Sequence, residues 1–534
     1  MYEPKISLIR LPSFFRKQQF SSKLNYCLIP PLGMGLIAGY LRARGIFLEQ
    51  DDLNIKIHYD NYYALTKNSA IDTEVFFDTE RIARYAQGDY DAGIDALMEK
   101  AIAKINLSKN QILLLSLPDN IENESNLMFA LAFTKLVKEK YNCIQIMGGE
   151  TLWLDLLKSK YKCRHIDYLI YGEGEMPVYH LLLSLSAHKQ LEAVPGLQVS
   201  EAGKIIRSSI TSKLISPDFS GLPMEYYRSQ EEVINYPEEL QALMHKFQLS
   251  KTLILPYRFI RGCPCECAFC VSSVKQVTDV LSPQEVAVHL KCLQERYRPT
   301  GFFFLNDTIN ISAGYVNMLC DEIIKQNLKI LWSDCARADN LDRDTIFKMR
   351  SAGCIRLIFG MESASPRILK YINKRIELTQ LENVLRWADE AGIWTGVEVI
   401  CGLPHERNED IEATINFLKQ NNEYINRVYL NHFDLRENTP FYNQPERFGI
   451  KRIFDVHQYA EKDFISYVRF GFDEQDGLAW ADKQEQIERS LKKVLKECSP
   501  GVRYFTDEHF LFYLYSMSCA KENIRRMYQE IVKN

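Results

Sequence analysis

Short apolar runs alternate with amphipathic stretches through roughly the first 190 residues of the chain. The apolar runs have the length of buried strands, and the stretches between them repeat apolar positions with the period of a helix. Alternating strands and helices favour a parallel sheet with helices on both faces. We therefore predict an α/β fold that begins with a doubly wound, Rossmann-like domain over residues 1–195. Its expected strands lie at 6–12, 46–53, 111–119, 143–150 and 167–175, and its expected helices at 33–45, 91–106, 124–140 and 177–186.

A second strand–helix series begins at residue 256, with a spacing of roughly 25–35 residues between units. Six successive units of this kind close into a full or partial barrel. We predict a partial (β/α)6, TIM-like barrel over residues 251–438. Its expected strands lie at 256–262, 301–307, 329–339, 354–363, 394–403 and 427–433, and its expected helices at 282–297, 313–326, 342–352, 366–391 and 408–420.

Two further segments complete the predicted organisation. Residues 196–208 predict a hairpin that turns at 201–203, and the polar stretch that follows predicts a linker, so we group residues 196–250. Residues 439–534 carry helical runs of mixed charge and many aromatic residues, which predicts a mostly helical C-terminal domain. The insertion at about 54–90 has no role that the sequence reveals.

Polar and glycine-rich segments follow three predicted strands of the first domain, at 116–120, 148–150 and 172–175. Each segment alone is typical of a tight turn, but ligands of parallel sheets bind beyond the carboxyl ends of strands, where these segments would meet. The glycines that open the helix at 33–45 lack the strand that a dinucleotide-binding fingerprint needs directly before them. They favour instead a helix end that another group can approach closely.

The composition excludes several classes of protein. The chain has 534 residues, a length that suggests roughly three domains, and its 46% hydrophobic and 25% charged residues are ordinary for a globular protein. A net charge of -4 gives no electrostatic reason to expect nucleic acid. Fourteen cysteines are too dilute for a disulfide scaffold and, without a secretory signal, predict reduced thiols in the cytoplasm. No apolar run reaches the length of about 20 residues that a transmembrane helix needs.

Three cysteines stand close together directly after the first strand of the second series. Cys263, Cys267 and Cys270 are separated by three residues and then by two. Three thiolates on one short loop suit an iron–sulfur cluster that keeps one iron free for another ligand. A zinc knuckle and a disulfide are the alternatives, although structural zinc normally takes four protein ligands. Cys265 is a spare thiol or a competing ligand.

These residues resemble a known family. The segment CPCECAFC is similar to the CxxxCxxC signature of the radical S-adenosylmethionine (SAM) superfamily, and FFFLND, SDCARAD, GMESAS and ICGLPHERNEDIEATINFL resemble successive segments of its partial barrel. In the same way PPLGMGLIAGYLRARG, MGGE and DYLIYGEGE resemble the N-terminal domain of its B12 (cobalamin)-dependent branch. The DxHxxG motif of many B12 proteins is absent, as in many members of this branch, which implies cobalamin without a histidine ligand.

The resemblance implies cofactors and contacts. Cys263, Cys267 and Cys270 are expected to hold a [4Fe-4S] cluster, whose fourth iron would take the amine and carboxylate of SAM. The alternative is a structural salt bridge or helix cap for the polar SAM candidates, plain packing for Phe269, and a tight turn for the glycine-rich cobalamin segments. The candidate SAM contacts are Phe269, Asn306, Asp307, Arg337, Glu362, Ser363 and Glu398. The candidate cobalamin contacts are Pro31, Gly33, Ser116, Asn120, Gly148, Gly149, Glu150, Gly172 and Glu173.

The implied function is that of a cobalamin-dependent radical SAM methyltransferase. It would methylate an unactivated carbon of a small-molecule, natural-product or peptide substrate. Its electron donor would be a flavodoxin or ferredoxin. Radical oxidation, cyclisation or rearrangement without methyl transfer is the first alternative. A non-catalytic protein that binds an iron–sulfur cluster or cobalamin is the second. The sequence does not identify the substrate or a catalytic residue.

Overall fold

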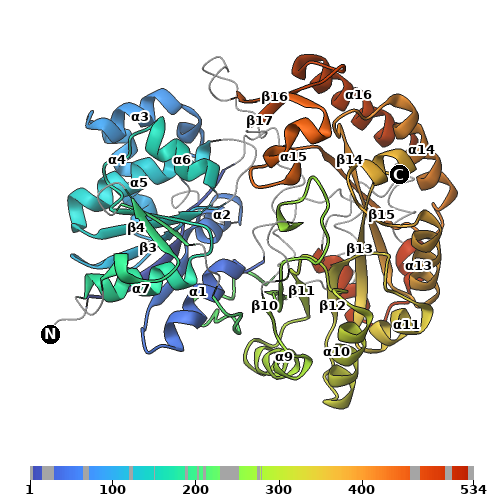
Figure 1. Cartoon of the computed structure of the whole chain (residues 1–534). Helices are drawn as coiled ribbons and strands as arrows, with labels where there is room; N and C mark the ends of the chain where they lie inside the picture. Colours follow the sequence, from blue (N-terminus) through green and yellow to red (C-terminus); the bar gives the residue numbers. More distant parts are fainter. Residues whose placement is uncertain are drawn as a thin grey trace. The chain divides into compact units, whose positions relative to one another are not determined.

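Seven strands form the sheet of the first part of the chain in this computed structural model (Figure 1). The strands are β1 (Ile6–Arg10), β2 (Glu49–Asp52), β3 (Ile112–Ser116), β4 (Ile144–Gly149), β5 (Tyr168–Tyr171), β6 (Leu197–Ser200) and β7 (Ile205–Ser208). They lie in the order β2-β1-β3-β4-β5-β7-β6, and all neighbours except β6 and β7 are parallel. This order is that of a doubly wound sheet, as predicted.

The structure describes most of the chain. The described residues are 4–14, 29–63, 71–118, 124–149, 151–186, 190–200, 204–208, 212–228, 252–273, 277, 279–456, 470–498 and 508–526. The chain divides into two compact units, Met1–Lys251 (unit 1) and Thr252–Asn534 (unit 2), where the sequence predicted four segments.

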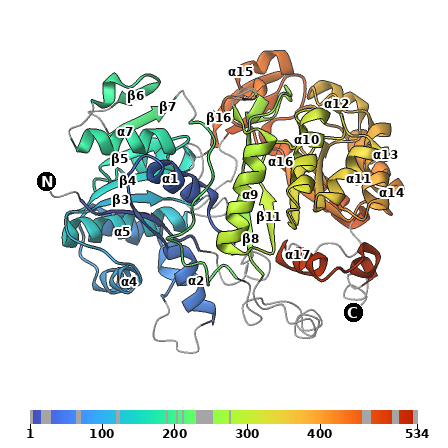
Figure 2. The same ribbon diagram turned by 90° about the horizontal axis from the view of Figure 1, so that it is seen from below.

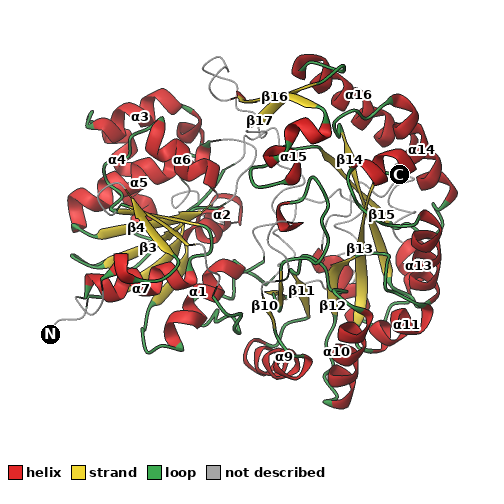
Figure 3. Ribbon diagram, in the orientation of Figure 1, coloured by secondary structure: helices red, strands yellow, loops and turns green. Residues whose placement is uncertain are grey.

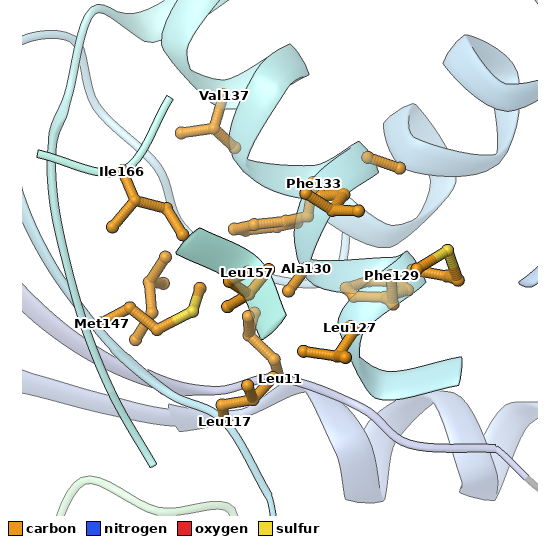
Figure 4. Close-up of a cluster of buried hydrophobic side chains, with 14 of the residues drawn as sticks. Leu11, Leu117, Leu127, Phe129, Ala130, Phe133, Val137, Met147, Leu157 and Ile166 are labelled. Atoms are coloured by element: carbon orange, nitrogen blue, oxygen red, sulfur yellow. The ribbon is translucent and has the colours of Figure 1, made fainter. Parts of the chain in front are cut away.

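Helix α5 (Ser125–Tyr141) is the centre of the core of unit 1. All of its residues from Ser125 to Val137 are buried, because helices pack on its outer side as well as the sheet on its inner side. The outer cover is α3 (Thr79–Gln87), α4 (Ala92–Ile102) and the 3-10 turn η4 (Glu74–Phe77). Figure 4 shows the apolar contact between α5, the strand ends and α6. The remaining helical elements are α1 (Leu32–Arg42), α2 (Leu53–Tyr63), α6 (Thr151–Ser159), α7 (Glu175–Leu185) and η5 (Leu191–Ala193).

The insertion at 54–90 therefore has a structural role that the sequence did not reveal. It supplies η4 and α3, and the rings of Phe76 and Tyr85 are buried in the same cluster as Phe129 of α5. Helix α6 was also missing from the prediction, which placed no helix between those expected at 124–140 and 177–186.

The predicted hairpin is present but belongs to the sheet of unit 1. Strands β6 and β7 pair antiparallel, and β7 pairs parallel with β5 from Leu169↔Ile205 to Tyr171↔Arg207. The prediction had ended the first domain before this hairpin, at residue 195. The turn at 201–203 and linker residues 229–250 lie outside the described residues.

Part of the predicted linker packs closely on α1. A Cβ added to Gly35 would lie 2.4 Å from the ring of Phe219, and one added to Gly39 would lie 2.5 Å from the carbonyl oxygen of Ser216. Gly35 and Gly39 thus make room for the chain at 216–219, a close approach that the absence of side chains at these two positions permits.

Unit 2 contains six parallel strands in the order β15-β14-β13-β12-β11-β8 (Figure 3). They are β8 (Ile254–Tyr257), β11 (Gly301–Phe304), β12 (Trp332–Ala336), β13 (Cys354–Glu362), β14 (Trp394–Cys401) and β15 (Arg427–His432). Neighbouring strands follow one another in sequence, so the predicted (β/α)6 arrangement is confirmed. The helices of the series are α9 (Pro283–Tyr297), α10 (Ala313–Lys325), α11 (Arg343–Ser351), α12 (Pro366–Tyr371), α13 (Leu378–Glu390) and α14 (Asn408–Gln420).

The helix predicted at 366–391 is two helices, α12 and α13. The segment between them contains Asn373 and Arg375, both in the left-handed region at φ 54° and 53°. Asn373 donates a hydrogen bond of 2.9 Å to the carbonyl oxygen of Glu266, and Arg375 forms an ion pair of 3.2 Å with the Glu266 carboxylate. The break therefore turns the chain towards the cysteine loop, defined as residues 262–270.

The C-terminal segment is less purely helical than predicted. It includes α15 (Pro440–Asn443), the 3-10 turn η8 (Pro445–Phe448), α16 (Trp480–Cys498) and α17 (Glu508–Ser516), but also the antiparallel hairpin of β16 (Ile450–Asp455) and β17 (Phe470–Glu474). Helix α16 packs on α14 and β15, and α17 packs beside β8 (Figure 2). These contacts explain why the segment forms one unit with the barrel. None of the described helices is both long enough and apolar enough to span a bilayer.

Candidate active site

The cysteine loop leaves the carboxyl end of β8 through the short strand β9 (Ile260–Arg261), which pairs with β10 (Asp279–Val280), before the 3-10 turn η7 (Val271–Ser273). Gly262 adopts φ 89°, a conformation that favours glycine. Its N–H donates a hydrogen bond of 2.8 Å to Asp307, in the segment that follows β11. Asp307 also accepts a hydrogen bond from Ser272. The predicted SAM contact Asp307 thus holds the first residue of the cysteine loop and the turn η7 that follows the loop.

The middle of the loop is held by two further elements. The N–H of Ala268 donates to the carbonyl oxygen of Ile372 at 2.8 Å, and the N–H of Phe441 donates to the carbonyl oxygen of Ala268 at 3.1 Å. Ala268 and Phe441 are buried in one hydrophobic cluster, and the half-buried Phe269 packs against it. The C-terminal segment therefore packs directly against the cysteine loop.

No disulfide joins the cysteines of the loop, so the disulfide alternative to a cluster is not present in the structure. A hydrogen bond between the thiols of Cys263 and Cys265 raises the pKa of Cys263 and lowers the pKa of Cys265 to about 6. Burial raises the pKa of Cys267, which is 5% exposed. Within the described ranges, no three His, Cys, Asp or Glu side chains are arranged as a ready metal site. The fit of a cluster therefore depends on the chemistry of the donors, which is three thiols on one loop.

Two buried cations lie behind these thiols. Arg337 places a guanidinium nitrogen 3.9 Å from the sulfur of Cys267, while it donates to Asp339 at 2.7 Å and to the carbonyl oxygen of Lys374 at 2.7 Å. The ammonium of Lys374 lies 5.9 Å from the ring centroid of Phe269. Burial opposes the charge of both cations, but nearby anions more than offset it and raise the pKa of each. The site thus offers a positive field to thiolates, the forms that bind metals.

Lys374 forms a buried ion pair with Glu362 at 2.8 Å. Glu362 ends β13 at φ 68°, next to a register shift in the pairing with β14. A Cβ added to Gly360 would lie 2.6 Å from the Glu362 carboxylate and 2.8 Å from the Lys374 ammonium. The two charged groups therefore occupy the space that the absence of a side chain at Gly360 leaves.

Glu398 lies next to this ion pair on β14. The pKa of Glu398 is raised to about 7, first by burial and then by the nearby Glu362 carboxylate, while Lys374 acts to lower it. The structure thus brings four predicted SAM contacts, Phe269, Arg337, Glu362 and Glu398, around the ammonium of Lys374.

Two other predicted SAM contacts are engaged within the protein. The amide oxygen of Asn306 accepts hydrogen bonds from the backbone of Phe259 and Ile260, and its nitrogen donates to Asp334 at 2.6 Å. Ser363 is 1% exposed, and its hydroxyl lies 3.3 Å from that of Thr414. These contacts give Asn306 and Ser363 structural roles.

Lys374 and Asp334 were not among the site residues predicted from the sequence. Most of the predicted SAM contacts were polar residues at strand ends. Lys374 lies between helices α12 and α13, so this criterion did not include it. Asp334 lies within β12, where it is fully buried, and burial raises its pKa well above the ordinary range of a carboxyl. A charged residue inside an otherwise apolar strand was the signal that could have found it.

The predicted cobalamin contacts of unit 1 lie at one edge of its sheet. Ser116, Gly148–Gly149 and Gly172 end or follow β3, β4 and β5, which are neighbours in the sheet. A Cβ added to Gly172 or to Gly33 would meet nothing within 4 Å, whereas one added to Gly149 would lie 2.8 Å from the carbonyl oxygen of Leu117. Pro31 precedes α1, and Glu173 is half-buried. Asn120 and Glu150 lie outside the described residues.

Residues 257–418 match the family model of the radical SAM superfamily. This segment is a radical SAM domain. Such a domain implies a [4Fe-4S] cluster and SAM as cofactors. The matched residues begin in β8 and end in α14, so the radical SAM domain includes the cysteine loop and all the charged groups around Lys374.

Relatives extend the similarity beyond the radical SAM domain. The chain is 28% identical over 291 residues to an uncharacterized methyltransferase of Pyrococcus horikoshii, covering 52% of this chain and 58% of that protein. It is 25% identical over 379 residues to the anaerobic magnesium-protoporphyrin IX monomethyl ester cyclase of Rubrivivax gelatinosus, covering 68% of this chain and 60% of that protein. The chain thus spans less than two thirds of the length of these curated relatives.

Solved structures share the fold across the whole chain. The radical SAM methyltransferase TsrM of Kitasatospora setae, with tryptophan and a SAM analogue bound, has a TM-score of 0.60 at 13% identity and covers 99% of both chains. The cobalamin-dependent radical SAM enzyme OxsB has a TM-score of 0.57 at 14% identity and covers 99% of this chain and 72% of that chain. At these identities the similarity shows a common fold.

Proposed function

We propose that the protein is a cobalamin-dependent radical SAM methyltransferase. The observation that carries the proposal is the combination of a cysteine loop at the carboxyl edge of a six-stranded parallel sheet with a separate doubly wound sheet before it. The full-length similarity in fold to a methyltransferase with cobalamin and a [4Fe-4S] cluster bound supports it.

The proposed cluster ligands are Cys263, Cys267 and Cys270. The chemistry that such a cluster supplies when bound is the one-electron reductive cleavage of SAM. The residues around the loop exclude water, since Ala268 is 1% exposed and Phe269 packs against the adjoining hydrophobic cluster. Arg337 and Lys374 stabilise thiolates in this poorly hydrated site through their charge.

Cobalamin is proposed at the glycine-rich edge of unit 1, where Gly148, Gly149 and Gly172 follow neighbouring strands. In a doubly wound sheet this edge is where ligands bind. The role of cobalamin would be to carry a methyl group. Methylation is supported by a hopanoid C-3 methylase among the relatives, 23% identical over 240 residues, from Methylococcus capsulatus.

The partners and location follow from the proposed chemistry. The substrate is proposed to be a small molecule, natural product or peptide with an unactivated carbon. Reductive cleavage needs a low-potential electron donor, for which a flavodoxin or ferredoxin is suited. An oxygen-sensitive cluster and free thiols need a reducing compartment, so the cytoplasm is proposed.

Anaerobic reconstitution with iron, sulfide, cobalamin and SAM tests the proposal. With a strong reductant the protein should release 5′-deoxyadenosine and retain cobalt at about one atom per chain. Cys267→Ala should lose iron and cleavage, whereas Cys292→Ala, which alters an exposed thiol on α9, should keep both. Cys265→Ser should keep the cluster. A fully loaded cluster without 5′-deoxyadenosine would favour the non-catalytic alternative.

Radical chemistry without methyl transfer is the second candidate function. The similarity to the magnesium-protoporphyrin IX monomethyl ester cyclase favours it, because that match covers 68% of this chain. SAM labelled in its methyl group separates the two candidates. Label in the product supports methyl transfer, and 5′-deoxyadenosine with an unlabelled product supports oxidation or cyclisation.

A further inference from the structure

Glu398 occupies the middle of the inner face of the barrel sheet. In register it stands between Gly360 of β13 and Tyr429 of β15. The adjoining residues Val397 and Val399 are buried, whereas Glu398 is half-buried. Figure 1 shows α11, α13 and α14 along one side of these strands. The buried Val397 and Val399 are assigned to the helix-covered face, and because successive side chains of a strand alternate, Glu398 is assigned to the opposite side.

Its neighbours confirm this direction. A Cβ added to Gly396 would lie 2.6 Å from the ring of Tyr429 and 3.5 Å from Ile358, so the face that contains Gly396 and Glu398 is lined by these side chains. Ile400, two residues further along the same face, packs against the hydrophobic cluster that contains Ala268 of the cysteine loop. Glu398 therefore faces the space next to that loop.

The charges on this face do not balance around Glu398. Lys374 is paired with Glu362 at 2.8 Å, which leaves one ammonium for two carboxylates. Among the described residues, the Glu398 carboxylate makes no hydrogen bond or ion pair. The next cation on the face, Arg356, donates to Tyr429 and Ser333 at 3.3 Å.

The face also carries aromatic surface. Arg427 stacks over the ring of Tyr429 at 4.3 Å, and the guanidinium of Arg356 lies 5.3 Å from the ring centroid of Phe303. Both arginines are thus engaged with aromatic rings deeper along the strands. A ligand beside Glu398 would meet one carboxylate, one aromatic ring and the Glu362–Lys374 pair.

We propose that Glu398 binds a protonated amino group of the substrate inside the barrel. A half-buried carboxylate without a countercharge is stabilised either by a proton or by a cation, and the nearby ammonium of Lys374 is already paired with Glu362 at 2.8 Å. A hydroxyl group would leave the negative charge uncompensated, so an ammonium is the better ligand. The inference rests on the proposed function, because it assigns the substrate of the same site to amine-bearing compounds.

The test measures binding of benzylammonium and of its neutral counterpart, benzyl alcohol, by saturation-transfer NMR at pH 8. The cluster-loaded wild type should bind benzylammonium about tenfold more tightly than benzyl alcohol, a difference of about 1.4 kcal/mol. Glu398→Gln should abolish this preference. The matched control Glu409→Gln, which neutralises an exposed carboxylate of α14, should keep it.

Several outcomes would overturn the inference. The wild type could show no preference for the ammonium, or Glu398→Gln could retain the preference. Saturating SAM could also displace benzylammonium, which would assign Glu398 to the amino group of SAM. Circular dichroism checks that Glu398→Gln is folded. Release of 5′-deoxyadenosine is measured separately, so failure of the proposed function is distinguishable from failure of this assignment.

Discussion

Lys374 stabilises unit 2 through an ion pair whose two side chains are 7% and 5% exposed. Lys374→Met should therefore lower the free energy of unfolding by about 3–5 kcal/mol, because it leaves the Glu362 carboxylate buried without its partner. The control Lys348→Met removes an exposed pair with Asp321 and should cost at most about 1 kcal/mol. Urea unfolding measures both. If the double variant Lys374→Met/Glu362→Gln is no more stable than Lys374→Met alone, the explanation by an unpaired charge is wrong.

Glu406 should make stability depend on pH. Burial raises the pKa of Glu406 to about 7 from an ordinary value of 4.5, although the N–H of Gly402 donates to its carboxylate at 2.6 Å. Between these values the folded protein holds a proton that the unfolded chain has lost. Stability therefore falls as pH rises through this window and levels off above it.

Glu406→Gln should flatten this fall by about 2–3 kcal/mol between pH 4.5 and pH 8, since each pKa unit is worth about 1.4 kcal/mol. The measurement is the free energy of unfolding in urea at several pH values. Glu409→Gln, three residues further on and exposed, should leave the pH profile unchanged. Parallel profiles for wild type and Glu406→Gln would show that another group causes the dependence.

Helix α15 links the C-terminal segment to the cysteine loop. Phe441→Ala should destabilise unit 2 by about 3–5 kcal/mol, because its ring is fully buried. It should also reduce the iron retained after reconstitution, since the ring packs beside Ala268. Phe76→Ala removes an equally buried ring from the core of unit 1 and should leave iron retention unchanged. Equal iron retention in the two variants would contradict the link.

At the scale of helices and strands, the periodicity of the sequence predicted most elements well, but it predicted less well which other segments they contact. The helix predicted at 282–297 is present as α9, and its capping box at Ser282 depends only on neighbouring residues. The break between α12 and α13 was not predicted, because hydrogen bonds to Glu266, over 100 residues earlier in the chain, stabilise it. The candidate site follows the same rule: the cysteines are contiguous, whereas Lys374 acquires its role only through the fold.

At the scale of the whole molecule, each of the two compact units has a cluster of buried hydrophobic residues of its own among the described residues. Thermal unfolding of the full chain should therefore show two transitions. Reconstitution of the cluster with SAM should raise the midpoint of one transition only, because a ligand stabilises the unit that binds it. Differential scanning calorimetry measures both midpoints, and Phe76→Ala assigns the transition of unit 1. A single transition that shifts as a whole would mean that the units unfold together.

Helix α17 closes the amino ends of the barrel strands. A Cβ added to Gly301, the first residue of β11, would lie 2.2 Å from the ring of Phe512, and Tyr515 donates at 2.9 Å to the carbonyl oxygen of Gly392 before β14. Strand β8 therefore gains its last neighbour only when residues about 250 positions later arrive. Contacts so distant in sequence form late. During synthesis on the ribosome, the first barrel strands would stay incompletely covered until α17 has been made. Chaperones would be needed most before that point.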